Sequence, residues 1–147
     1  MSSETQSGPP LCNCLALRQA ARQVTQLYDR HLAAAELRTT QFSILAKLRR
    51  LGPMTINRLA AEMVMDRTTL GRNILPLERD GLIAIRQGTA DKRHKELALT
   101  PAGAGRLRRA AKLWANAQKE FETQFGVERA AGLRSELREV AAIGARP

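Results

Sequence analysis

The stretch MDRTTLGRNILPLERDGL, residues 65–82, contains the pattern that decides the fold. Leu70, Ile74 and Leu77 recur at steps of four and three residues, which predicts that they form the buried stripe of a helix. Asp66 comes directly before the first helical turn, where a carboxylate can accept hydrogen bonds from free backbone N–H groups. We therefore expect a short capped helix, and the question is what its polar residues contact.

The polar residues in the first turns of this helix point away from the buried stripe, because successive residues lie about 100° apart around a helix axis. Arg can read guanine, Asn can pair with adenine, and Thr can contact a thymine methyl group or a phosphate, so these residue types suit the major groove of DNA. A solvated helix face is the alternative. The candidate DNA-contacting residues here are Arg67, Thr68, Thr69, Arg72 and Asn73.

Pro76 is unusual inside a helix, because it removes one backbone hydrogen bond and crowds the carbonyl near Arg72. We expect the helix to bend or loosen at this point. Our hypothesis is that the bend lets the first turns enter a groove while Leu77 and Leu82 stay anchored in the core.

A second capped helix is predicted directly before the first. Thr55 stands as an N-cap between Met54 and Leu59, at the spacing of a hydrophobic staple, and Asp66 has the same arrangement of apolar neighbours. Only a few residues separate the two helices, so the chain must turn sharply between them, as it does in a helix-turn-helix. An ordinary helical hairpin is the alternative.

Two short segments of alternating apolar and polar residues follow, at 83–86 and 97–100, and predict a β-hairpin. Because a two-stranded hairpin is marginal alone, it must pack on the neighbouring helices. Its connection, RQGTADKRHK at 86–95, is polar, basic and flexible at Gly88.

The tip of this hairpin is the second candidate DNA contact. Lys92, Arg93 and Lys95 surround it, and an Arg in such a place can enter a narrow minor groove, where the potential is most negative. Asp91 is close enough in sequence to orient Arg93 through a charge-assisted hydrogen bond. A solvated basic loop is the alternative, but a polar helix followed by a basic hairpin is a more specific combination than either alone.

The remaining chain is predicted to be helical, which makes the fold class mainly α with one small hairpin. Residues 1–10 are rich in Ser, Thr, Gln, Gly and Pro and are expected to be a disordered tail before a single domain at 11–147. Gly and Pro stop the second helix, and a Thr-Pro pair starts the next one. The additional predicted helices are residues 11–34, 40–51, 101–125 and 127–143.

The composition indicates one basic domain. A length of 147 residues with 44% hydrophobic content is enough for one core and too little for two. The formal net charge of +10 predicts a polyanionic partner, with nucleic acid first and an anionic membrane surface second, while a generally basic surface is the alternative. The 3% aromatic content argues against a single-strand binder that stacks bases. No apolar stretch long enough to span a membrane and no secretory signal are present, so we expect a cytoplasmic protein.

The order TTQFSILAKL, GPMTINRLA, MDRTTLGR, LERDGLI, DKR and LALTPAG, from about residue 40 to residue 103, resembles the MarR family, the multiple antibiotic resistance type of bacterial transcription regulator. The resemblance implies a winged helix-turn-helix at 40–100 and dimerisation helices at 11–39 and 101–147. It makes residues 66–79 the recognition helix and Asp91 and Arg93 the wing pair. Thr55 and Arg79 complete the candidate DNA contacts. The Ile-Leu-Pro run at 74–76 departs from the usual family pattern.

A homodimer is also expected on physical grounds, because the first and last helices carry more apolar surface than a small winged module can bury. Two symmetric recognition helices require an inverted repeat in double-stranded DNA, with half-sites about one helical turn, roughly 34 Å, apart. Binding should weaken steeply with salt. Within the family, such a regulator is more often a repressor than an activator.

The resemblance further implies a crevice between the dimerisation helices and the winged module that accepts small aromatic or phenolic anions. An apolar cavity with a few cations suits such an effector, which would favour a dimer with misplaced recognition helices. The alternative is that the aromatic residues are ordinary core and the arginines are solvated or paired. The expected walls are Cys14, Arg18, Arg22, Tyr28, Phe42, Leu45 and Trp114.

The pair Cys12 and Cys14 raises a redox-sensing alternative. On one helix the two thiols would point about 200° apart, so a disulfide would need the partner subunit or a frayed helix start. With only His31 nearby in sequence, the pair does not supply the four ligands of a closed zinc site, and we expect no metal and no cofactor. Packed or surface thiols are the remaining possibility.

Two other classes of protein fit the sequence less well. An enzyme is not expected, because neither His31 nor His94 stands in a nucleophile or metal motif and no glycine-rich phosphate loop occurs. A non-specific architectural protein that coats DNA would share the charge and the salt dependence. It would need only cations on its surface, however, whereas Thr68, Thr69 and Asn73 add neutral hydrogen-bonding groups.

Overall fold

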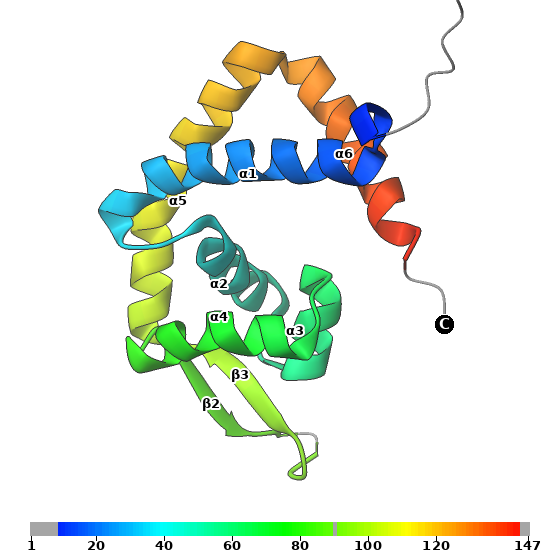
Figure 1. Cartoon of the computed structure of the whole chain (residues 1–147). Helices are drawn as coiled ribbons and strands as arrows, with labels where there is room; N and C mark the ends of the chain where they lie inside the picture. Colours follow the sequence, from blue (N-terminus) through cyan, green and yellow to red (C-terminus); the bar gives the residue numbers. More distant parts are fainter. Residues whose placement is uncertain (1–8, 90, 145–147) are drawn as a thin grey trace, which may run out of the picture.

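The computed structural model describes residues 9–89 and 91–144, and over these ranges the chain is mainly helical (Figure 1). The fold class and the winged helix-turn-helix predicted from the sequence are confirmed. Residues 1–8 of the predicted tail lie outside the described residues, and Pro9–Leu11 form a short 3-10 helix, η1. The helices are α1 (Asn13–Leu32), η2 (Ala33–Ala35), α2 (Thr39–Leu51), α3 (Ile56–Met63), α4 (Arg67–Arg79), α5 (Pro101–Phe125) and α6 (Val127–Ala142).

Side-chain caps start three helices at the predicted residues. Thr55 Oγ1 accepts the Arg58 N–H at 3.2 Å at the start of α3. Thr100 Oγ1 accepts the Gly103 N–H at 3.0 Å at the start of α5, and Asp66 caps α4 in the same way. These caps satisfy backbone donors that would otherwise lack partners within the helix.

The start of α2 differs from the prediction, which placed it at Thr40. Arg38 occupies the cap position, and its backbone N–H donates to Gln41 Oε1 at 3.0 Å. The Thr39 N–H donates to Asp29 Oδ1 of α1 at 2.7 Å. The helix therefore begins one residue earlier, because a side chain distant in sequence supplies an acceptor.

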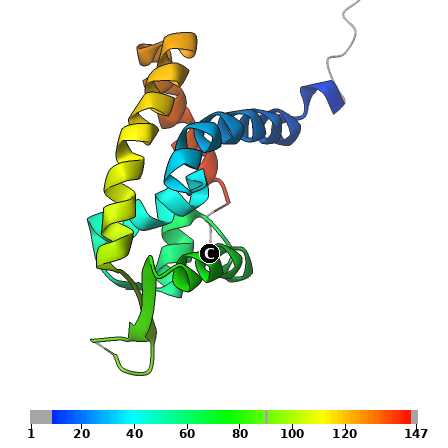
Figure 2. The ribbon, with the colours of Figure 1, turned by 90° about the vertical axis from the view of Figure 1, so that its left-hand side faces the viewer.

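The sheet has three antiparallel strands in the order β1-β3-β2, where β1 is Met54–Thr55, β2 is Ile83–Gln87 and β3 is Lys95–Leu99. The β2–β3 hairpin matches the predicted wing and projects beyond the helices when seen from the side (Figure 2). The β1 strand was not predicted, since two residues are too few to show an alternating pattern. It pairs Met54 with Leu97 and so anchors the hairpin to the helix-turn-helix.

The predicted stripe of α4 lies in the core of the winged module. Leu70, Ile74 and Leu77 are 0%, 3% and 1% exposed and belong to one cluster with Leu45 and Leu59. The α4 helix continues through Pro76 and ends at Arg79, so the proline does not interrupt it.

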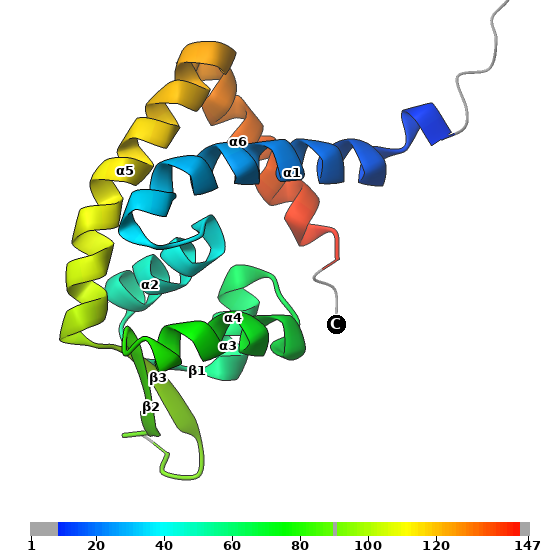
Figure 3. The same cartoon turned by 60° about the vertical axis from the view of Figure 1, so that its left-hand side comes forward.

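Helices α1, α5 and α6 form the other end of the molecule. Figure 3 shows α5 rising from the sheet to the far end, where the chain turns back as α6 and passes α1. The Tyr28 hydroxyl of α1 donates a hydrogen bond to Gln118 Oε1 of α5. His31 Nε2 of α1 lies 2.5 Å from Glu120 Oε2 of α5. No helix within residues 9–89 and 91–144 combines the length and the apolar character needed to cross a membrane.

The base of α5 is in close contact with the junction between α4 and β2. Thr100 Oγ1 donates to the Gly81 carbonyl at 2.6 Å, and the Thr100 N–H donates to the Leu82 carbonyl at 3.1 Å. A Cβ atom at Gly103 would lie only 2.0 Å from that Leu82 oxygen. Only glycine fits there, so the wing and the long helix meet without a gap.

Candidate nucleic-acid interface

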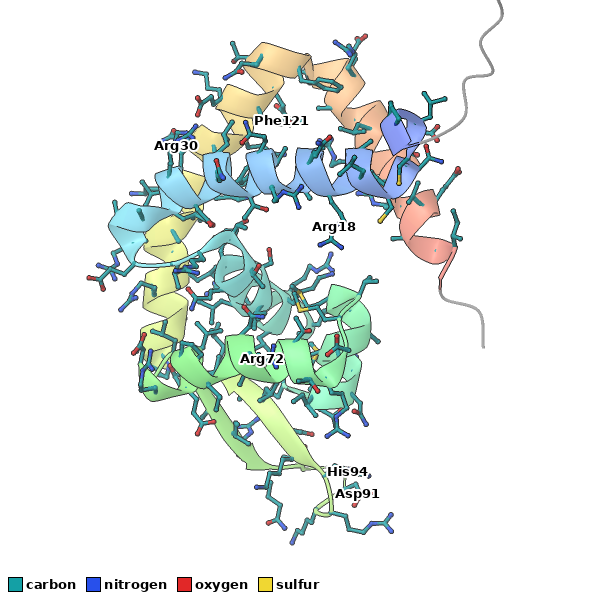
Figure 4. The ribbon with its side chains drawn as sticks, in the orientation of Figure 1. Arg18, Arg30, Arg72, Asp91, His94 and Phe121 are labelled. Atoms are coloured by element: carbon teal, nitrogen blue, oxygen red, sulfur yellow. The ribbon has the colours of Figure 1, made fainter. Side chains whose placement is uncertain are left out.

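The exposed face of α4 carries the predicted base contacts. Thr68 and Arg72 are both exposed and lie opposite the buried stripe, as the sequence predicted, and Arg67 is exposed on their flank. Among the described residues, these three side chains make no hydrogen bond within the protein and so can serve an external partner. Figure 4 shows Arg72 on α4, with Asp91 and His94 at the far end of the hairpin.

Two other predicted contacts on α4 are used within the helix. Thr69 Oγ1 donates to Asp66 Oδ2 at 2.9 Å, and Asn73 Nδ2 donates to the Thr69 carbonyl at 2.9 Å. Hydrogen bonds from the Thr69 backbone N–H and hydroxyl also hold the pKa of Asp66 below its usual value. This bond uses one of the two N–H groups of the Asn73 amide, so the second N–H and Oδ1 can still pair with a base.

The wing pair has the predicted geometry. Arg93 Nε and Nη2 lie 3.1 Å from Asp91 Oδ1 and Oδ2, respectively, and the Arg93 backbone N–H donates to Oδ1 at 3.0 Å. These bonds, the side-chain bonds of Arg93 first, lower the pKa of Asp91. Lys92 and Lys95 are exposed on the same hairpin. The wing therefore presents a group of cations, one of which is held in a fixed direction.

The last two predicted contacts lie away from the first turns of α4, at the start of α3 and at the end of α4. Thr55 is half-buried and its hydroxyl oxygen is engaged in the α3 cap, whereas Arg79 is exposed beside Asp80 at 3.6 Å. Arg38 lines, with Arg72 and Arg79, a polar cavity of about 540 Å³ between α1, α2 and α4. Sequence reasoning missed Arg38 because its position depends on how α1 and α2 pack.

The predicted effector residues are spread over several environments. Phe42 stacks on Trp114 with ring centroids 6.1 Å apart. Two of the residues expected to line the effector crevice are therefore in contact. Leu45 is fully buried, and Tyr28 lines an apolar groove on the α6 side instead. Cys14, Arg18 and Arg22 are exposed on α1. The effector site stays a prediction.

Cys12 and Cys14 are free and exposed at the start of α1. Cys12 is the N-cap, and its Sγ accepts the Leu15 N–H at 3.4 Å. Cys12 thus lies just outside the helix while Cys14 lies within it. Their redox role remains a prediction.

Comparison with known proteins places this arrangement in a family. The MarR family model matches residues 37–95, which span α2 to the start of β3. The transcriptional regulator MosR of M. tuberculosis, crystallised with DNA, is 36% identical to the chain with a TM-score of 0.81, and the alignment covers 91% of this chain and 96% of MosR. The chain belongs to the MarR family.

Two further similar proteins extend the comparison. The transcriptional repressor CouR, solved with a DNA duplex, is 26% identical to this MarR-family chain with a TM-score of 0.80. The alignment covers 88% of this chain and 92% of CouR. The HTH-type transcriptional regulator YwoH of Bacillus subtilis is 34% identical over 84 residues, which are 57% of this chain. This chain spans only 61% of the length of YwoH in that match.

Proposed function

We propose that this MarR-family chain regulates transcription by binding double-stranded DNA. The α4 helix enters the major groove, and the β2–β3 wing reaches the adjacent minor groove. The observation that carries the proposal is the exposure of Thr68 and Arg72 opposite the buried stripe, together with an Arg93 that Asp91 holds in place at the wing tip. Hydrogen-bonding groups aimed outward from a helix and a basic hairpin beside it match the two grooves of B-DNA.

The proposed active form is a homodimer on a pseudo-palindromic operator, with residues 11–39 and 101–147 as its dimerisation region. An apolar groove of about 420 Å³ between α1, α5 and α6 is lined by Leu17, Phe121 and Leu133, among others. Leu137 and Val140 of α6 are also exposed in the single chain, at 39% and 41%. A partner chain would cover these side chains, because so much contiguous apolar surface is unfavourable in water.

We further infer that the regulator acts as a repressor that a small aromatic or phenolic ligand releases from DNA. The described repressor activity of CouR supports the first part. The Phe42–Trp114 stack offers an aromatic surface for the second. A thermal-shift screen of aromatic acids, repeated with Trp114→Ala, tests this: we expect a stabilising acid whose effect the variant reduces.

The DNA-binding proposal is tested with the fragment upstream of the chain's own gene, labelled for fluorescence anisotropy and measured against excess random DNA. The Thr68→Ala/Arg72→Ala double variant should lose operator binding, whereas Arg109→Ala, an exposed arginine of α5, should not. Each lost phosphate contact should also reduce the slope of log affinity against log salt by about 1. Unchanged operator occupancy in the double variant would refute the proposal.

The oligomeric state is tested separately by analytical ultracentrifugation. Leu137→Arg places a charge in the apolar groove and should yield monomers. Arg50→Ala, at an exposed position of α2 outside the proposed dimerisation region, should remain dimeric. A wild-type protein that is monomeric at micromolar concentration would contradict the dimer.

A further inference from the structure

One large apolar side chain on the DNA-facing side of α4 has no partner in the core. Leu75 is 66% exposed, although it lies between the fully or almost fully buried Ile74 and Leu77 in sequence. Seven residues after Thr68, it is rotated by only about 20° from that residue around the helix axis. Leu75 therefore stands on the same ridge as Thr68 and Arg72, opposite the core.

The surroundings of Leu75 decide what kind of partner it can meet. Arg72 and Arg79 lie one turn before and one turn after it on the exposed ridge, and with the exposed Glu78 beside them the ridge keeps a net positive charge. A second copy of this chain packed on the ridge would bring like charges together, which is unfavourable. A polyanion with apolar groups between its charges fits instead, and the major groove presents such groups as the C5-methyl groups of thymine.

We propose that Leu75 is a specificity-determining residue that contacts the C5-methyl group of one thymine in each half-site. This inference rests on the proposed DNA-binding function. Leu75 lies about 4.5 Å further along the helix than Arg72, at 1.5 Å per residue, which is comparable to one base step of about 3.4 Å. The thymine is therefore about one or two base pairs from the base that Arg72 reads.

Deoxyuridine provides the test, because it pairs as thymine does but lacks the methyl group. A duplex selected from random DNA with the wild-type protein supplies the half-site, and each of its thymines is then replaced singly by deoxyuridine. At one position of the half-site, replacing thymine by deoxyuridine should lower the affinity of the wild-type protein for the duplex about fourfold. This is the effect expected from losing one buried methyl group. The Leu75→Ala variant should bind the thymine and uracil duplexes equally. Its affinity for the thymine duplex should be about fourfold lower than that of the wild-type protein.

Two controls separate this contact from other effects. Leu75→Met keeps a large apolar side chain and should keep the difference between thymine and uracil. Thr68→Ala should bind more weakly overall but retain the difference at the Leu75 position. If wild-type protein binds DNA specifically with no sensitivity to any thymine methyl, or if Leu75→Ala keeps that sensitivity, this inference fails and the proposed function stands. If no specific duplex is selected at all, both fail.

Discussion

Asp91 holds Arg93 through both of its carboxylate oxygens, with Oδ1 and Oδ2 each 3.1 Å from a guanidinium nitrogen. The Arg93 side chain is nevertheless 87% exposed. The carboxylate thus fixes the direction of the cation without burying it. An acidic group beside the proposed DNA contact would repel phosphates, so we expect Asp91 to help binding only by orienting Arg93.

Asp91→Asn should therefore weaken DNA binding, although it removes a negative charge. We expect a roughly fivefold loss of affinity, the effect of one lost hydrogen-bonded interaction, in fluorescence anisotropy at fixed salt. Arg93→Ala should lose at least as much, and the double variant should lose no more than Arg93→Ala alone. Tighter binding by Asp91→Asn would mean that charge outweighs orientation at the wing.

The cap of α4 predicts a pH dependence of stability. Thr69 lowers the pKa of Asp66 below its ordinary value of 3.8, because its N–H and hydroxyl donate to the ionised carboxylate. The stabilisation is complete above that ordinary value and is lost as the pH falls through the lowered pKa of the folded state. Asp66→Asn keeps an acceptor but cannot titrate. In urea unfolding from pH 7 to pH 3, the advantage of wild type over Asp66→Asn should shrink once the pH falls below 3.8. An advantage independent of pH would contradict this account.

The backbone conformation of Val64, in the turn between α3 and α4, leads us to expect that a substitution there stabilises the protein. It adopts φ 52° and ψ 49°, a left-handed conformation that is unfavourable for a β-branched residue, and its side chain is 72% exposed. Val64→Gly should raise the free energy of unfolding by about 1 kcal/mol, since it relieves this strain and loses little packing. Urea denaturation measures the change. Val64→Ile, which retains the β-branch, should give no gain, and an equal gain in both variants would point to another cause.

Pro76 is the residue of α4 at which we expect stability and DNA recognition to be coupled. Pro76→Ala restores a backbone N–H that can donate to the Arg72 carbonyl, so it should raise the free energy of unfolding by roughly 1–3 kcal/mol. We expect DNA affinity to fall, because the altered helix would present Arg72 differently. Gly71→Ala is the control, since its new Cβ meets no protein atom within 4 Å and it strengthens the same helix without changing the proline. Higher stability with unchanged affinity in Pro76→Ala would make the proline a tolerated defect.

The parts of the fold that depend on local sequence could be predicted from it. Thr55, Asp66 and Thr100 cap their helices with their own neighbours, and the spacing of apolar residues reveals the stripe of α4 directly. The start of α2 and the β1 strand could not be found in this way. They depend on Asp29 and Leu97, which reach their partners only after distant parts of the chain have packed.

The candidate site shows the same division. The outward direction of Thr68 and Arg72 follows from helical periodicity, and the Asp91–Arg93 pair follows from proximity in sequence. The Asn73 bond to the Thr69 carbonyl was not anticipated, since an amide can donate either to its own helix or to a base. Leu75 was overlooked because an apolar residue beside a buried stripe is expected to belong to it.

The contact between Gly103 and the Leu82 carbonyl has a mechanical consequence. With no room for even a methyl group at that contact, α5 and the wing cannot slide past each other without breaking the Thr100 hydrogen bonds. In the proposed dimer, a tilt of α5 about its far end, near Phe125, would therefore move the wing together with the helix. In that dimer, the orientation of the α5 helices would therefore decide how far apart the two wings lie.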